Sequence, residues 1–266
     1  MSPPTIVVKK DVIKLSGWPT DVVALDFDTF GRNENDAASS FIHTYILFVP
    51  GNPGLVGWYE PALKSILQQV GPGYAIRGLS YAGHGVTKEV VDIETYEFAE
   101  NDSATANVQI PWTVNGQVEH TIAWIDTILK PQSKQEKLMF ISHSIGSHLV
   151  QRVLLLRPDL RCRTRLLMHW MPFIRMDAPT FIQRQLDLVA SHPNVVIRLL
   201  KLTLERMSKE QADFFLKKVV PDEEGRKLSV DLVQNPTFVR NFLELGTEEI
   251  RTLPQLIDVP SLRIIL

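Results

Sequence analysis

The sequence predicts an α/β fold with a mostly parallel central sheet and helices on both faces. Apolar strand patterns alternate with helical patterns three times between residues 44 and 170, and such alternation is typical of parallel strands joined by right-handed crossovers. The strand patterns also end in short glycine-containing turns, at the edge of the sheet where open α/β folds carry their chemistry.

Composition narrows the protein class before any motif is considered. Hydrophobic residues make up 44% of the chain and the formal net charge is −2 at pH 7, so the chain is globular and has no basic surface for nucleic acid. Cys162 is the single cysteine, which excludes an internal disulfide and a thiolate zinc site and fits a reducing compartment. The chain has no secretory signal pattern and no apolar run near the roughly 18–20 residues of a spanning helix. We therefore expect a soluble or peripheral protein.

The N-terminal part is expected to contain four strands and one helix. Residues 5–16 and 20–28 are β-rich and predict an antiparallel opening. The continuous apolar run 44–49 is typical of a strand buried on both faces, and 75–80 predicts the strand that follows. Apolar residues recur at helical spacing over 59–70, which predicts a covering helix between these two strands.

The pattern continues to residue 169 with two more strands, 138–141 and 164–169, and with helices over 118–129 and 145–156. We assign residues 1–171 to one core domain. From residue 172 to 250 helical patterns follow one another without a strand, which predicts a helical lid inserted into the core. The four lid helices are expected at 179–191, 195–207, 208–219 and 235–245.

One lid segment has two interpretations. Residues 195–207 are rich in leucine, with Arg198, Lys201 and Arg206 interspersed, and this composition could lie on a lipid surface. The same segment could pack over the mouth of a site as an ordinary amphipathic helix.

The turn after strand 138–141 carries the first candidate site. Ser142-His143-Ser144-Ile145-Gly146 matches the G-x-S-x-G pattern of a nucleophile elbow, with Ser142 in place of the first glycine. In such an elbow the serine at the tip has strained backbone angles and its hydroxyl stands clear of the sheet. Ser144 occupies this tip and is the candidate nucleophile, although five residues of this kind also suit an ordinary strand-to-helix turn.

Two further turns follow strand patterns. Pro50-Gly51-Asn52-Pro53-Gly54 contains two glycines and two prolines, and there Gly51 and Asn52 could present a backbone N–H to a ligand. The alternative is a rigid tight turn. His84 lies between two glycines in a third turn, but a base at this position would precede the nucleophile, so a structural turn histidine is the better interpretation.

Three motifs occur together and in order: Phe48–Tyr59, Tyr81–Gly85 and His143–Ser147. Together they resemble the lipid droplet-associated hydrolase family of the α/β-hydrolase superfamily, over roughly residues 20–170. The resemblance implies an α/β-hydrolase fold and a serine hydrolase of sterol or acylglycerol esters. It also implies a location on lipid droplets or the endoplasmic reticulum surface, on the cytoplasmic side.

Carried over by position, the resemblance makes Ser144 the nucleophile and the backbone N–H groups of Asn52 and Ile145 the oxyanion hole. The implied reaction is acyl transfer: the Ser144 hydroxyl attacks an ester carbonyl, a histidine takes its proton, and water later releases the acyl group. No metal or organic cofactor is called for, and the expected partners are the lipid ester and the droplet surface.

The C-terminal region departs from the family. Members of the family place the triad acid and histidine in a C-terminal segment that follows a strand similar to residues 262–266. Here the last histidine, His192, falls in the expected lid. Asp177 and Asp258 are candidate acids that also suit plain surface carboxylates. We therefore expect 251–266 to be the incomplete start of the C-terminal core, with the last strands missing, and the chain to be a poor enzyme.

Two functions remain open at this point. The chain is either a serine hydrolase of lipid esters or a catalytically impaired lipid-droplet-binding protein that uses its apolar lid. A thioesterase or peptidase on the same fold is a third possibility, because the divergent lid would form the acyl site.

Overall fold

A computed structural model describes residues 4–28, 42–85, 113–129, 136–173, 192 and 195, and most of the chain from 198 to 253. The gaps in that last stretch are 200–201, 204–205, 219, 221 and 234. Several predictions fall outside the described residues. They are the connection 86–112, the lid helix 179–191 and the strand 262–266.

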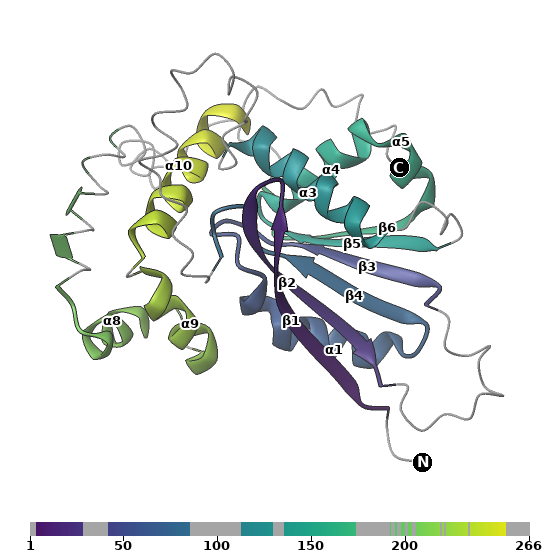
Figure 1. Ribbon diagram of the computed structural model, residues 1–266, viewed down its shortest axis with the longest axis horizontal. Coiled ribbons are helices and arrows are strands. Elements are labelled where there is room, and N and C mark those ends of the chain that lie inside the picture. Colours follow the sequence, from purple (N-terminus) through teal and green to yellow (C-terminus); the bar gives the residue numbers. More distant parts are fainter. Residues whose placement is uncertain are drawn as a thin grey trace.

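The core is a six-stranded sheet with the strand order β1-β2-β4-β3-β5-β6 (Figure 1). β1 pairs antiparallel with β2, and β2 pairs antiparallel with β4, whereas β4, β3, β5 and β6 are mutually parallel. The predicted α/β class, with its antiparallel opening, is confirmed. The strands are β1 Ile6–Leu15, β2 Trp18–Phe27, β3 Thr44–Val49, β4 Tyr74–Leu79, β5 Lys137–His143 and β6 Thr164–Trp170.

Helices cover both faces of this sheet (Figure 1). Helix α1 (Glu60–Val70), preceded by the 3-10 turn η2 (Val56–Tyr59), lies on one face. Helices α3 (Val114–Ile128), α4 (Gly146–Leu156) and α5 (Pro158–Arg163) lie on the other. The short α5 has no counterpart in the sequence prediction, because six residues are too few to show a helical period.

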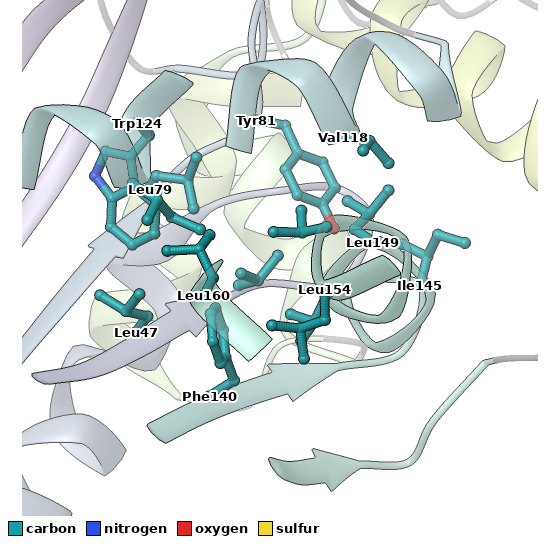
Figure 2. Close-up of a cluster of buried hydrophobic side chains, with 14 of the residues drawn as sticks. Leu47, Leu79, Tyr81, Val118, Trp124, Phe140, Ile145, Leu149, Leu154 and Leu160 are labelled. Atoms are coloured by element: carbon teal, nitrogen blue, oxygen red, sulfur yellow. The ribbon is translucent and has the colours of Figure 1, made fainter. Parts of the chain in front are cut away.

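The central strand β3 explains why its sequence is apolar throughout. Its residues point alternately to the two faces: Ile46 and Phe48 pack with α1, and Leu47 and Val49 pack with α3 and α4. Figure 2 shows the largest of the buried hydrophobic clusters, in which Tyr81 packs with apolar side chains from α3 and α4. This burial on both faces holds the carboxyl ends of β3 and β5 side by side.

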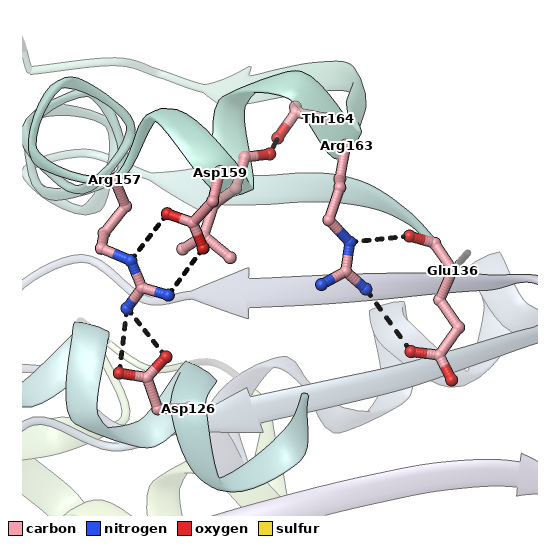
Figure 3. Close-up of polar contacts among 7 residues, drawn as sticks. Asp126, Glu136, Arg157, Asp159, Arg163 and Thr164 are labelled. Atoms are coloured by element: carbon pink, nitrogen blue, oxygen red, sulfur yellow. Dashed lines mark hydrogen bonds and ion pairs between the residues drawn. The ribbon is translucent and has the colours of Figure 1, made fainter. Parts of the chain in front are cut away.

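Polar contacts join the C-terminal end of α4 to α3 and α5 (Figure 3). The Arg157 guanidinium bonds both oxygens of Asp126 on α3, at 2.8 and 2.9 Å, and both oxygens of Asp159 on α5. The Arg163 side chain donates to the Glu136 carbonyl at 3.1 Å, just before β5. These contacts tie the helix that follows the elbow to both adjacent elements.

Three helices of the predicted lid region lie together beside the core: α8 (Lys209–Leu216), α9 (Glu223–Val233) and α10 (Pro236–Thr252) (Figure 1). Helix α9 is absent from the sequence prediction, because its residues are mostly polar and follow Pro221. Helix α10 was predicted to end at residue 245 and continues to Thr252. Its last two turns are polar in sequence, so the apolar period fades although Glu249 there is buried.

Among the residues described, no helix is both long enough and apolar enough to cross a bilayer.

Candidate active site

The elbow between β5 and α4 has the strained backbone expected of a nucleophile turn. Ser144 has a φ of +50°, a left-handed value that is uncommon for a residue other than glycine. Two hydrogen bonds hold this conformation: the Ser144 N–H donates to the Trp170 carbonyl at 3.0 Å, and the Phe173 N–H donates to the Ser144 carbonyl at 3.0 Å. The last residue of β6 and a residue of the segment that follows it therefore fix the tip of the elbow.

Two glycines allow the loop after β3 to touch the elbow. A Cβ atom added to Gly51 would lie 2.6 Å from His143 Nδ1 and 2.8 Å from Ser144 Cβ. A Cβ atom added to Gly146 would lie 2.6 Å from the Val49 carbonyl oxygen. Both positions therefore need glycine, because any side chain would separate the two loops.

Ser142 fits the position that the elbow pattern usually gives to glycine. Its side chain is fully buried. Its hydroxyl bonds the Ser147 hydroxyl at 3.3 Å and His169 Nδ1 at 2.6 Å. A small side chain with satisfied hydrogen bonds is thus accommodated between β5 and α4.

Asn52 and Ile145 carry the two backbone N–H groups that were expected to form an oxyanion hole. Within the described residues, neither the Asn52 N–H nor the Ile145 N–H donates a hydrogen bond. One belongs to the loop after β3 and the other to the residue after Ser144, and the contacts of Gly51 hold these two segments together. Free N–H groups at such a place can bind a developing oxyanion.

Tyr59 links the same two segments, a role that the sequence did not predict. Its hydroxyl accepts the Gly51 N–H at 3.4 Å and lies 2.8 Å from His143 Nδ1. Burial raises the pKa of Tyr59 and lowers that of His143. The phenol therefore stays protonated and the imidazole stays neutral, so the phenol O–H can donate a hydrogen bond to His143 Nδ1. The only signal in the sequence was the position of Tyr59 at the end of the first family motif.

None of the seven histidines hydrogen-bonds to the Ser144 hydroxyl, and all seven lie among the described residues. His143 and His169 bond Tyr59 and Ser142, as described above. His148 is buried on α4, and both its ring nitrogens lack a hydrogen-bond partner in the described part of the chain. Burial lowers the pKa of His148 to about 4, so this ring stays neutral at pH 7.

His84 has the structural role that its turn suggested. Its Nδ1 bonds the Pro53 carbonyl at 2.7 Å, and its ring packs edge-on against Tyr81 and Phe238. Burial lowers the pKa of His84 to about 4. The candidate acids Asp177 and Asp258 lie outside the described residues.

Helix α10 closes over the loop that carries Asn52. The Asn52 side-chain amide donates to the Phe242 carbonyl at 3.1 Å, and Gly246 approaches the same amide nitrogen closely. One residue before Phe242, the Asn241 amide donates to the Gly83 carbonyl at 2.7 Å. The last described helix of the chain is therefore part of the wall around the elbow.

A cavity of about 460 Å³ lies between the β1–β2 hairpin, η2 and α9. Trp58, Ser80 and Leu228 are among the residues that line it, and Ser144 is not. We therefore do not assign this cavity to the acyl group of a substrate.

Comparison with known protein families identifies the relatives of this chain. Residues 43–261 match the model of the family described as lipid-droplet associated hydrolase. The chain belongs to this family. The match covers the loop after β3, the elbow and α10, and it confirms the resemblance seen in the three sequence motifs.

Curated members of the lipid-droplet associated hydrolase family are similar over less than half of this chain. Human lipid droplet-associated hydrolase is 31% identical over 115 residues, 43% of this chain and 34% of the human protein. The rat protein is 32% identical over 115 residues, with the same two shares. The chain spans about a third of the length of the curated relatives that it matches.

Solved structures confirm the α/β-hydrolase fold. The epoxide hydrolase CorEH superposes with a TM-score of 0.59 at 10% identity, over 93% of this chain and 76% of that enzyme. The haloalkane dehalogenase DbeA from Bradyrhizobium elkani gives a TM-score of 0.56 at 16% identity, over 98% of this chain and 74% of that enzyme. At these identities the likeness concerns the fold alone.

Proposed function

We propose that this member of the family is a serine hydrolase of lipid esters, such as sterol or acylglycerol esters, and that Ser144 is its nucleophile. One observation carries the proposal. Ser144 has a left-handed φ, and the nearby Asn52 and Ile145 N–H groups donate no hydrogen bond within the described part of the chain. The names of the relatives support the lipid-droplet setting.

In the proposed reaction the Ser144 Oγ attacks the ester carbonyl carbon and the carbonyl oxygen gains the negative charge. The Asn52 and Ile145 N–H groups stabilise this oxyanion, and one such donor contributes about 3–4 kcal/mol to the transition state. The alcohol leaves with a proton, and water then releases the acyl group from Ser144.

The attacking hydroxyl must lose its proton, and none of the seven histidines, all of them described, hydrogen-bonds to it. Triads that lack one member keep only about 10³–10⁴-fold catalysis over the uncatalysed reaction. We therefore expect slow acylation of Ser144 in residues 1–266.

The test is the intact mass of the purified chain after treatment with a fluorophosphonate. The expected result is one adduct per chain in the wild-type protein and in Ser147→Ala, but none in Ser144→Ala. Ser147→Ala is a matched control, because Ser147 lies in the same elbow with its hydroxyl buried. The absence of an adduct on a folded wild-type chain would exclude Ser144 as a nucleophile in this polypeptide.

A second function, binding to a lipid surface without catalysis, is favoured by the exposed apolar side chains of the lid region. Phe214 and Phe215 on α8 are 68% and 67% exposed. Val195, Leu199 and Leu202, from the segment with two interpretations, are more than half exposed, which supports a lipid-facing role for it.

Flotation with phospholipid-coated triolein droplets tests the second function. We expect Phe214→Ser/Phe215→Ser to lower the bound fraction severalfold relative to the wild type. Val12→Ser, at an exposed position on β1, is the control and should leave the bound fraction unchanged. Equal flotation of all three proteins would exclude this surface.

A further inference from the structure

Two tyrosine hydroxyls hold the loop after β3. The Tyr81 hydroxyl donates to the Pro50 carbonyl, and the Tyr59 hydroxyl accepts the Gly51 N–H at 3.4 Å. In the described part of the chain Tyr81 makes no hydrogen bond to the elbow. The Tyr59 hydroxyl does, because it also bonds His143 Nδ1 at 2.8 Å. Of these two phenols, Tyr59 therefore joins the loop directly to the elbow.

The loop needs such a link at Gly51. This residue precedes Asn52, whose N–H is expected in the oxyanion hole, and glycine has little conformational preference of its own. A side chain cannot restrict it, because a Cβ atom here would collide with His143 and Ser144. The direction of the peptide between Gly51 and Asn52 therefore depends on hydrogen bonds, and the Gly51 N–H gives its bond to Tyr59.

The phenol ring of Tyr59 is itself held by rigid neighbours. Tyr59 is the last residue of η2 and the N-cap of α1. Its ring centroid lies 4.6 Å from that of Phe48 on β3 and 5.7 Å from that of His143. Phe48 packs in turn against Trp170 at 5.8 Å, and the Trp170 carbonyl accepts the Ser144 N–H. A side chain supported in this way can fix the position of a mobile neighbour.

We propose that the Tyr59 hydroxyl is a positioning group for the oxyanion hole: it clamps the loop after β3 to the elbow and thereby sets the spacing between the Asn52 and Ile145 N–H groups. The inference rests on the proposed function, because it concerns the same two N–H groups. Among the described residues Tyr59 makes no hydrogen bond to Ser144. It acts through the loop and the elbow.

The clamp also fixes the tautomer of His143. The Tyr59 oxygen accepts the Gly51 N–H, so its single proton is donated to His143 Nδ1. Burial lowers the pKa of His143, and the ring is therefore neutral at pH 8. A neutral imidazole that accepts at Nδ1 carries its proton on Nε2. The packing of the two rings alone does not impose this choice.

Histidine ¹⁵N NMR at pH 8 tests the bond between the phenol and the imidazole. We expect the Nε2–H tautomer for His143 in the wild type. The Nδ1 signal should change in Tyr59→Phe, because this variant keeps the ring and loses the donated proton. His143→Leu identifies both signals by their disappearance. A proton on Nδ1 in the wild type, or an unchanged Nδ1 signal in Tyr59→Phe, overturns the clamp.

Asparagine ¹⁵N NMR tests whether the clamp reaches Asn52, and Asn52→Ser assigns the backbone signal by its disappearance. We expect the Asn52 N–H signal to shift in Tyr59→Phe and to stay in place in Tyr45→Phe. Tyr45→Phe is the matched control, because it makes the same change on β3 and the Tyr45 hydroxyl has no hydrogen bond among the described residues. An Asn52 signal that does not move in Tyr59→Phe overturns the proposal.

Fluorophosphonate labelling of Ser144 measures the effect on the proposed reaction. Removing an oxyanion donor lowers rates by about 10²–10³-fold, and we expect misplacement of the loop in Tyr59→Phe to lower the maximal rate constant about tenfold. The reagent concentration at half the maximal rate should change less than about twofold, because the hole binds charge that develops in the transition state. Tyr45→Phe should label like the wild type, and circular dichroism checks that each protein is folded.

A double-variant comparison tests whether the two ends of the clamp act together. His143→Leu removes the acceptor of the phenol proton and should slow labelling about as much as Tyr59→Phe. Residues that act as one unit give non-additive effects, so the double variant should be no slower than the slower single variant. Additive losses would mean that Tyr59 and His143 act separately and would overturn the clamp.

These readouts separate the two proposals. No labelling of the folded wild type or of any variant would overturn the serine hydrolase, while the two NMR measurements would still decide whether Tyr59 positions Asn52. Equal maximal rates in the wild type and in Tyr59→Phe would overturn the positioning role and leave the hydrolase standing.

Discussion

Replacement of Glu249 by glutamine should change how the stability of the protein depends on pH. The pKa of Glu249 is raised from 4.5 to about 8, mainly by burial. A carboxyl group with a raised pKa in the folded state stabilises that state fully below the unfolded value of 4.5. This contribution is lost as the pH rises through about 8. Glutamine has no such loss, because it cannot ionise.

The size of the effect follows from the two pKa values. A rise from 4.5 to about 8 corresponds to about 5 kcal/mol, at about 1.4 kcal/mol for each pH unit. This is an upper value, because a charged Glu249 can draw in water or shift the loop. We expect the difference in unfolding free energy between Glu249→Gln and the wild type to grow by about 2–5 kcal/mol from pH 4 to pH 9.

Urea unfolding at pH 4, 6, 8 and 9 measures this difference. Comparing the two proteins cancels the titration of every other group, including the buried histidines. Parallel stability curves across this range would refute the reasoning, because they would mean that Glu249 is ionised in the folded protein at little cost.

Three further predictions concern other parts of the structure. Gly51→Ala should lower Ser144 labelling at least tenfold and the unfolding free energy by about 1–3 kcal/mol, since the added methyl group would collide with His143 and Ser144; labelling kinetics and urea unfolding check this. His148→Leu should be more stable than the wild type at pH 4.5 by up to about 3 kcal/mol, because burial lowers the pKa of His148 to about 4 and the native state loses stability as the pH falls from 6.5 towards that value. Unchanged acid stability in His148→Leu would contradict this burial. Arg157→Ala should lower the unfolding free energy by about 1 kcal/mol or less, and less in 0.5 M salt, because its ion pairs with Asp126 and Asp159 are partly exposed.

The strands were predictable because their side-chain pattern is set by burial. Residues 44–49 are apolar throughout, since β3 is covered on both faces, and this pattern gave its bounds correctly. The elbow was recognisable for a similar reason. A serine with a left-handed φ between a strand and a helix needs small neighbours, and Gly146 is one of them.

In the predicted lid region the sequence missed helix α9 and the last turns of α10, where the apolar period is weak. Helix α9 is mostly polar, and the last turns of α10 bury Glu249 in place of an apolar residue. Glutamate normally lies on the exposed face of a helix, so the sequence pattern predicted that α10 ends at residue 245.

The sequence by itself determined the α/β class, the strands of the core, the family and the candidate nucleophile Ser144. These depend on residues that are close together in the chain. Only the tertiary structure decided how the site is held, because the contacts join distant segments: Tyr59 meets His143 from 84 residues away, and Asn52 meets Phe242 from 190 residues away. Local periodicity carries no information on such pairs, so the partners of Asn52 became visible only when α10 was seen packed against the loop after β3.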